Sequence, residues 1–121
     1  MDIVVSALKK TWLLDLDGTL LRHNGYLLGG DELLDGAEEF LASIAGDAVV
    51  ILTARGEECR GETVAFLKGH GIRYDHIVFG LPAGERILMN DRKPSGMATA
   101  LAINKDRDAP VRCAVAVDPE L

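Results

Sequence analysis

The chain has 121 residues, 48% of them hydrophobic and 26% charged, a balance typical of a globular domain that excludes a disordered or fibrous protein. This length predicts one domain, residues 1–121, with a single core. The formal net charge of -6 argues against nucleic-acid binding, because proteins hold phosphate backbones with clustered Lys and Arg.

The sequence also bears on where the protein is located. No apolar run approaches the roughly 20 residues that a membrane span needs, and the first ten residues lack the charge order of a signal peptide. The two cysteines, Cys59 and Cys113, form no paired metal motif and indicate reduced thiols. We therefore expect a cytoplasmic protein with no membrane partner.

The predicted elements alternate between strands and helices. The first apolar residues, 3–8, fit either a strand or a helix. Alternation of strands with helices predicts a mainly parallel sheet covered on both faces, an α/β three-layer fold of about five strands. Short apolar runs predict strands over 11–16, 48–52, 76–80, 86–90 and 111–117, and helical periodicity predicts helices over 35–47, 57–68 and 94–104.

Polar side chains stand at the ends of three of these strands. Asp15 and Asp17 follow the first apolar run, Thr53 follows the second, and Asn90 with Asp91 ends the fourth predicted strand. Ligands of such sheets bind beyond the carboxyl ends of the strands. The strand ends therefore predict a polar pocket rather than part of the core.

The spacing of the first two aspartates suits phosphoryl transfer. Residues two apart in a strand point to the same side, so Asp15 and Asp17 face one small volume. An ionised Asp15 can attack phosphorus, and Asp17 can protonate the leaving oxygen and later activate water. Asp91 can join Asp15 in holding Mg²⁺, which prefers oxygen ligands and bridges to phosphate.

Small residues around these aspartates predict a phosphate site. Gly18 permits a sharp turn after the pair, and Thr19 can hydrogen-bond within that turn. The Thr53 hydroxyl and the backbone amides beside it, at Ala54 and in the turn at Gly18, can face a phosphate oxygen.

Three segments resemble the motifs of the haloacid dehalogenase (HAD) superfamily. They are DLDGTL at Asp15–Leu20, ILTAR at Ile51–Arg55 and NDRKP at Asn90–Pro94, and they occur in the family's order. The resemblance implies a Rossmann-like fold and a Mg²⁺-dependent phosphohydrolase. By this match Asp15 is the nucleophile, Asp17 the acid/base that also offers a carbonyl to the metal, Thr53 a phosphate ligand and Asp91 a metal ligand.

The spacing of the motifs is similar to that of members without a cap domain. Only short segments separate the three motifs, and residues 20–30 match the family's extra turn and hairpin. A capless site suits a large substrate unless an oligomer covers it, which leaves a homo-oligomer open. The sequence is also similar to small proteins of bacterial capsule and surface polysaccharide synthesis, which implies a phosphorylated sugar or glycan precursor as substrate.

The chain departs from the family pattern at two positions. Leu81 stands where the third motif is expected to supply a lysine, and Asn90 replaces one acidic residue of the fourth motif. Lys68, Arg86 and Lys93 can supply the missing cation, and Lys93 is favoured because it follows a predicted strand end. Arg55 can contact substrate, although arginines in a first helical turn are usually solvated.

Three functions remain open from the sequence. The first is a phosphatase acting through an aspartyl phosphate. The second is a binding or regulatory domain that keeps metal and phosphate binding but has weak turnover, as Leu81 and Asn90 suggest. The third is a receiver-like signalling domain, which the position of DLDGTL near the N-terminus disfavours.

Overall fold

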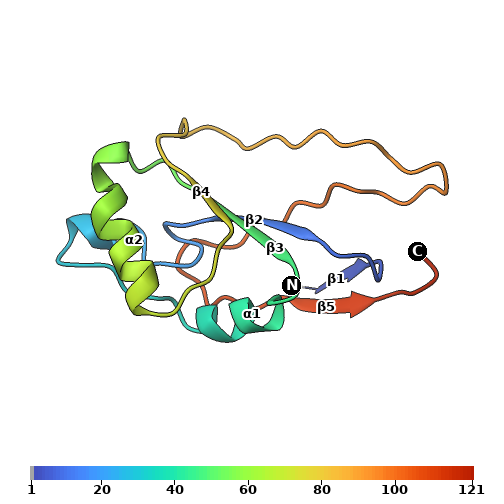
Figure 1. The fold of residues 1–121 in the computed structure, drawn as a ribbon, viewed down its shortest axis with the longest axis horizontal. Helices are drawn as coiled ribbons and strands as arrows, with labels where there is room; N and C mark the ends of the chain where they lie inside the picture. Colours follow the sequence, from blue (N-terminus) through green and yellow to red (C-terminus); the bar gives the residue numbers. More distant parts are fainter. Residues whose placement is uncertain (1) are drawn as a thin grey trace.

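A computed structural model describes residues 2–121 (Figure 1). The fold is mixed α/β, and all of its strand pairs are parallel. In chain order the elements are β1 (Asp2–Val5), β2 (Thr11–Asp15), the 3-10 helix η1 (Gly25–Leu27), α1 (Ala37–Ser43), β3 (Ala48–Leu52), the 3-10 helix η2 (Glu57–Cys59), α2 (Arg60–Gly69), β4 (His76–Val78) and β5 (Ala114–Val117).

The strands form two sheets instead of the single sheet of about five strands that the sequence predicts. One sheet has the order β2-β3-β4, and the other pairs β1 with β5. The ambiguous start of the chain is therefore a strand. A parallel neighbour in the same sheet needs a crossover connection, usually a helix. Residues 81–113 contain no helix, and β5, which follows them, pairs with β1 and not with the larger sheet.

The core lies on one face of the β2-β3-β4 sheet. Leu14 lies opposite Ile51 in the register of β2 and β3, and both are buried. Phe40 of α1 and Leu67 of α2 pack in the same cluster. On the other face Leu13 is 46% exposed. Both helices therefore cover one face, and the predicted layer of helices on the second face is absent from residues 2–121.

Helix α1 is shorter than the predicted range 35–47 at both ends, and its first residues explain its later start. Gly36 precedes the helix with a φ of 85°, in the left-handed region that favours glycine. A Cβ at Gly36 would lie 2.5 Å from the carbonyl oxygen of Val111, and the Val111 amide donates to the carbonyl of Asp35. Asp35, the predicted N-cap, therefore holds the C-terminal part of the chain instead of capping the helix.

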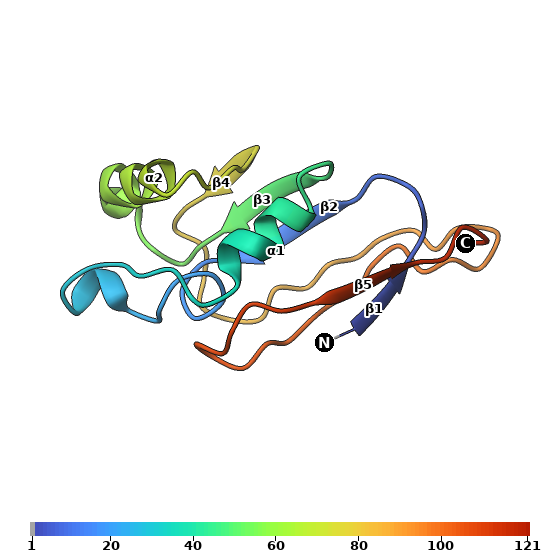
Figure 2. The ribbon, with the colours of Figure 1, turned by 90° about the horizontal axis from the view of Figure 1, so that it is seen from below.

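The second predicted helix and the third predicted strand are close to the structure. Residues 57–68 are helical as η2 followed by α2, which begins at Arg60 and ends at Gly69. The strand expected over 76–80 is β4, which ends two residues earlier. Figure 2 shows α1 lying across β2 and β3, with α2 beside β4.

The predictions of a strand over 86–90 and a helix over 94–104 are wrong. Residues 81–113 contain neither helix nor strand, and none of residues 81–110 is buried. Figure 1 shows this segment leaving the end of β4, running away from the helices and returning toward β2, where the Asp108 amide donates to the Gly18 carbonyl. We call residues 81–110 the extended segment.

A turn explains why the helix does not form. The Gly96 amide donates to the Lys93 carbonyl, and the Lys93 amide donates to the Met97 carbonyl. Pro94 therefore occupies the second position of a tight turn, which suits proline as well as a first helical turn does. Gly96 has a φ of 93°, which reverses the chain here.

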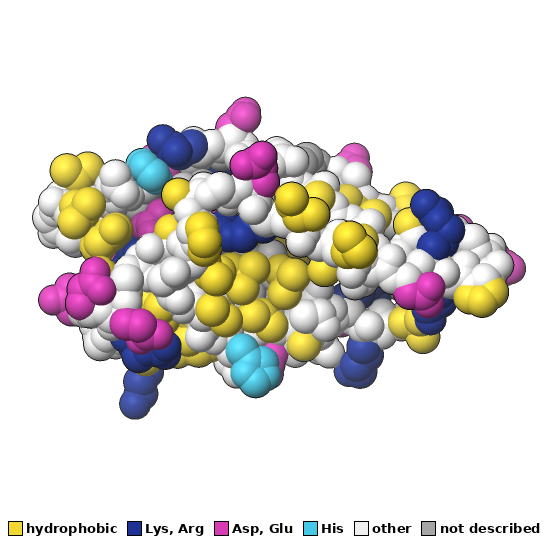
Figure 3. Space-filling model, turned by 90° about the horizontal axis from the view of Figure 1, so that it is seen from above, with side chains coloured by type: hydrophobic (Ala, Val, Ile, Leu, Met, Phe, Trp, Pro, Cys, Tyr) yellow, Lys and Arg dark blue, Asp and Glu magenta, His cyan; other side chains and the backbone are white. Residues whose placement is uncertain are grey.

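The open face of the sheet and the extended segment leave apolar side chains in water. Ile87 is 88% exposed and Met89 is 91% exposed. Figure 3 shows the side of the molecule along which the extended segment runs, with hydrophobic side chains gathered in the middle and charged ones mostly toward the rim. The apolar run at 86–90 is thus no evidence of burial.

Candidate functional site

The carboxyl ends of β2 and β3 bring two predicted site residues to one edge. Asp15 is the last residue of β2 and lies opposite Leu52, the last residue of β3. Thr53 follows Leu52 at once, and its amide donates to the Val78 carbonyl at the end of β4. The expected meeting of strand ends is therefore present for the first two strands.

A tight turn carries Asp17 beyond the end of β2. The amides of Thr19, Leu20 and Leu21 all donate to the carbonyl of Leu16, and Gly18 has a φ of 82°. Gly18 therefore permits the turn, as predicted. Its amide donates to the Leu21 carbonyl over 2.7 Å, so this N–H is used within the chain.

Asp15 presents an accessible carboxylate with a donor at each oxygen. The Thr19 hydroxyl donates to Oδ2 over 3.1 Å, which agrees with its predicted role in the turn. Arg86 Nη1 donates to Oδ1 over 3.4 Å, and the Asp15 side chain is 40% exposed. The carboxylate that is expected to attack therefore faces solvent beside a positive charge.

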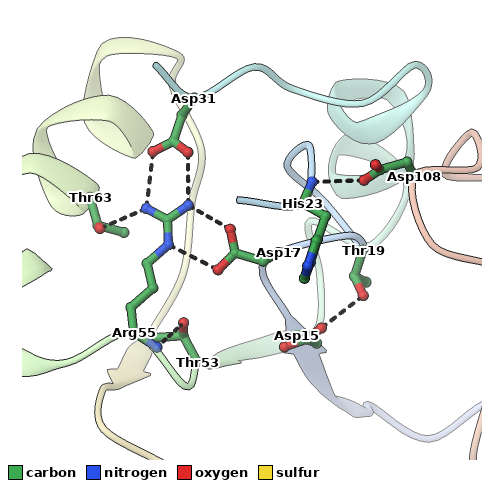
Figure 4. Close-up of polar contacts among 9 residues, drawn as sticks. All are labelled: Asp15, Asp17, Thr19, His23, Asp31, Thr53, Arg55, Thr63 and Asp108. Carbon is green, nitrogen blue, oxygen red and sulfur yellow. Dashed lines mark hydrogen bonds and ion pairs between the residues drawn. The ribbon is translucent and has the colours of Figure 1, made fainter. Parts of the chain in front are cut away.

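Arg55 joins two aspartates in a nearly buried cluster (Figure 4). Its Nε and Nη2 donate to the two oxygens of Asp17 over 3.0 and 2.8 Å. Its Nη1 and Nη2 donate to the two oxygens of Asp31 over 3.0 and 2.8 Å, and Nη1 also donates to the Thr63 hydroxyl. Only 1% of the Arg55 side chain is exposed. The expectation of a solvated arginine is therefore wrong.

The electrostatics of this cluster follow from its burial and charges. Burial alone lowers the pKa of Arg55, but the hydrogen bonds and charges of Asp17 and Asp31 outweigh it and raise that pKa above its usual range. Tyr26 lies 4.1 Å from the guanidinium, centroid to Cζ. Burial and the nearby charge of Asp17 raise the pKa of the Tyr26 phenol. Arg55 is therefore permanently charged in a place that water barely reaches.

Thr53 and Ala54 differ in their access to a ligand. Thr53 is 1% exposed, and its hydroxyl oxygen accepts the amide of Arg55 over 3.0 Å. Ala54 is exposed between them. In this arrangement Thr53 shapes the loop after β3, and Ala54 is the exposed residue of that loop.

The structure does not bring Asp91 to the other predicted metal ligands. Asn90 Nδ2 donates to the Thr99 carbonyl, and the Thr99 hydroxyl donates to the Asp91 carbonyl, which joins the two legs of the extended segment. Residues 2–121 contain no group of three or more His, Cys, Asp or Glu placed to hold a metal ion. The donor set of Asp15, Asp17 and Asp91 therefore does not fit Mg²⁺ in this arrangement.

The favoured source of the missing cation is also displaced. Lys93 lies in the turn of the extended segment and follows no strand end, so the reason for favouring it is wrong. Arg86, the other candidate in the extended segment, contacts Asp15. Arg86 is one of the alternative sources of the missing cation, but no pattern in the residues around it favours it over Lys93.

The returning end of the extended segment is fastened to the turn after β2. The Asp108 amide donates to the Gly18 carbonyl over 3.0 Å, and Asp108 Oδ1 accepts the His23 amide over 2.7 Å. Figure 4 shows His23 between the Arg55 cluster and Asp108. Sequence inspection assigned Asp31 and Asp108 no role, because their partners are far away in the chain.

Comparisons with known proteins give no match that bears on this site. No protein-family model matches the chain, and neither a curated protein nor a solved structure matches it. Among residues 2–121, no helix combines the length and the apolar character that crossing a membrane requires.

Proposed function

We propose that the protein is a phosphomonoester hydrolase in which Asp15 forms an aspartyl phosphate. The observation that carries the proposal is the Asp15 carboxylate, which lies at the end of β2, is 40% exposed and has Thr19 and Arg86 as its hydrogen-bond donors. The resemblance of DLDGTL and ILTAR to the HAD superfamily supports it, because DLDGTL begins and ILTAR continues beyond β3 at the same edge of the sheet. A phosphorylated sugar or glycan precursor is the proposed substrate class.

The proposed reaction has two steps at Asp15. The bond from a carboxylate oxygen to phosphorus forms as the bond to the leaving alcohol breaks, and the leaving oxygen takes a proton. Water then attacks the acyl phosphate, which releases phosphate and restores the carboxylate. Asp17 is the proposed acid and base, since each of its oxygens keeps an acceptor position besides the one that Arg55 fills.

Arg86 is the proposed replacement for the lysine that Leu81 displaces. Its Nη1 lies 3.4 Å from Asp15 Oδ1, so a phosphoryl group on Asp15 would meet the guanidinium. Guanidinium groups pair with phosphate oxygens in a bidentate way, and preorganised charge stabilises a phosphoryl transition state. Mg²⁺ dependence is a further proposal that rests on the resemblance alone.

A second candidate function is a phosphate-binding or regulatory domain with weak turnover. Two observations favour it: Asp17 is held by a buried arginine, and Asp91 lies in the extended segment. Such a domain would bind phosphorylated ligands at Asp15 without releasing phosphate.

Phosphate release separates the two functions. The assay uses a panel of sugar phosphates, nucleotides and an aryl phosphate, with Mg²⁺ and with chelator, on the wild type, Asp15→Asn and the control Asp35→Asn. Asp35 is an exposed aspartate outside the site. Turnover that Asp15→Asn abolishes and Asp35→Asn keeps supports the hydrolase, and the chelator arm tests the metal. Equal release by wild type and Asp15→Asn contradicts it.

A further inference from the structure

The guanidinium of Arg55 has no donor left for a ligand. An arginine has five N–H bonds. In this structure Nε donates to Asp17, Nη2 donates to Asp17 and Asp31, and Nη1 donates to Asp31 and Thr63, so five acceptors meet five donors. With 1% of its side chain exposed, Arg55 cannot bind substrate directly.

The cluster has one more carboxylate than a neutral ion pair needs. Asp17 alone would balance the charge of Arg55, yet Asp31 makes an equally close bidentate pair, and its side chain is only 8% exposed. Burying a second carboxylate is costly unless it is paired and hydrogen-bonded. Stability therefore gives a weak reason for Asp31, and the geometry gives a stronger one.

Asp31 binds the Nη1–Nη2 edge of the guanidinium, next to the Nε–Nη2 edge that Asp17 binds, and Thr63 accepts the remaining N–H of Nη1. Asp31 belongs to the loop before α1, and Thr63 to α2. Because the guanidinium is planar and rigid, the hydrogen bonds that Asp31 and Thr63 accept from Nη1 and Nη2 also fix the directions in which Nε and Nη2 point. These two groups hold both oxygens of Asp17, so the plane of that carboxylate is set in turn (Figure 4).

We propose that Arg55 and Asp31 are positioning residues that fix the orientation of the Asp17 carboxylate, the proposed acid and base. The inference rests on the proposed function, since it assigns the two residues a part in that reaction. A misaligned acid or base loses rate without losing substrate binding. Changes at Asp31 therefore lower kcat and leave KM near its wild-type value.

The test measures kcat and KM for para-nitrophenyl phosphate with the wild type, Asp15→Asn, Asp31→Asn and Arg55→Lys. Asp31→Asn keeps the side-chain shape and removes one charge and one acceptor. We expect a fall in kcat of roughly tenfold for Asp31→Asn and more for Arg55→Lys, because a misaligned acid or base loses only part of the 10²–10⁴-fold that acid–base catalysis contributes. Lysine keeps the charge but cannot form the two bidentate pairs, so Arg55→Lys does not keep the wild-type activity.

A matched control separates positioning from stability. Leu67→Ala lies on α2, removes a fully buried side chain and touches no member of the cluster's hydrogen bonds. It destabilises the fold but leaves kcat per folded molecule unchanged. If Asp31→Asn does not fold, Thr63→Val is measured in its place. It removes one acceptor and no charge, and we expect it to lower kcat by a smaller factor with the same KM.

The outcomes distinguish this inference from the proposed function. Equal activity of wild type and Asp15→Asn overturns both. An Asp15-dependent activity that Asp31→Asn leaves intact, or lowers only in proportion to the folded fraction, overturns the positioning role alone. A rise in KM at constant kcat also overturns it, because Asp31 would then act on substrate binding.

Discussion

Many apolar side chains are buried in the unit formed by residues 11–80, whereas none is buried in the extended segment. In the first region Leu16, Val49 and Ile51 have no measurable exposure. In the second, Ile87 and Met89 are almost fully exposed. Similar short apolar runs thus have opposite environments, so what decides burial is whether a neighbouring strand or helix is present.

The two regions also divide the candidate site between them. Residues 11–80 supply Asp15, Asp17, Asp31, Thr53 and Arg55, which are joined through strand ends and the buried cluster. The extended segment supplies Arg86 at one end and Asp108 at the other, while Asp91 lies between them. The rigid part of the site is therefore in the folded unit, and the extended segment touches it only near its two ends.

The largest difference in unfolding free energy is expected when isoleucine is replaced by alanine once in each region. Ile51→Ala in β3 removes a fully buried side chain and should cost about 2–5 kcal/mol of unfolding free energy. Ile87→Ala, at a position 88% exposed, should change it by less than about 0.5 kcal/mol. Urea unfolding of both variants measures the difference. A comparable loss for Ile87→Ala would mean that the extended segment packs in solution.

A smaller effect is expected from alanine at two glycines with similar backbone conformation. Gly36 and Gly96 have φ values of 85° and 93°, so both substitutions strain the backbone. Only at Gly36 does the new Cβ meet another atom, the Val111 carbonyl oxygen at 2.5 Å. Gly36→Ala should therefore cost about 1–3 kcal/mol more than Gly96→Ala. Equal midpoints in urea would show that residue 111 is not held against α1.

Much of the folded unit was predictable from the sequence because its signals are local. The apolar runs of β2 and β3 are bounded by charge or glycine and bury side chains of both strands in register. Asp15 and Thr53 at the strand ends follow from parallel pairing alone. Gly18 follows from the need for a sharp turn. The signals for these features, the apolar runs and the turn residues, each lie within a few positions of the chain, although the strands that pair are far apart.

The features that the sequence did not predict depend on distant partners. Arg55 is buried because it meets Asp17 and Asp31, which are 38 and 24 residues away. The pairing of β1 with β5 joins the two ends of the chain. At Pro94 two local signals compete, since proline suits both a helix start and a turn, and Gly96 with Met97 completes the turn.

The smallest effect on stability is expected from acidification, which tests whether Asp47 helps to hold β2 in the unit formed by residues 11–80. Burial raises the pKa of Asp47, but hydrogen bonds from the Trp12 indole and the Lys10 amide outweigh it and lower that pKa below its usual value. A pKa that is lower in the folded state means that the unfolded chain takes up the proton first as pH falls. The stability contributed by Asp47 is therefore present above about pH 4, the ordinary aspartate pKa, and is lost as pH falls through the folded value. Asp47→Asn should flatten the decline of the urea midpoint between pH 6 and pH 3. Parallel declines for the two proteins would mean that Asp47, directly before β3, does not hold β2 in solution. The contrast between a closed unit and an open segment would then be weaker than the structure shows.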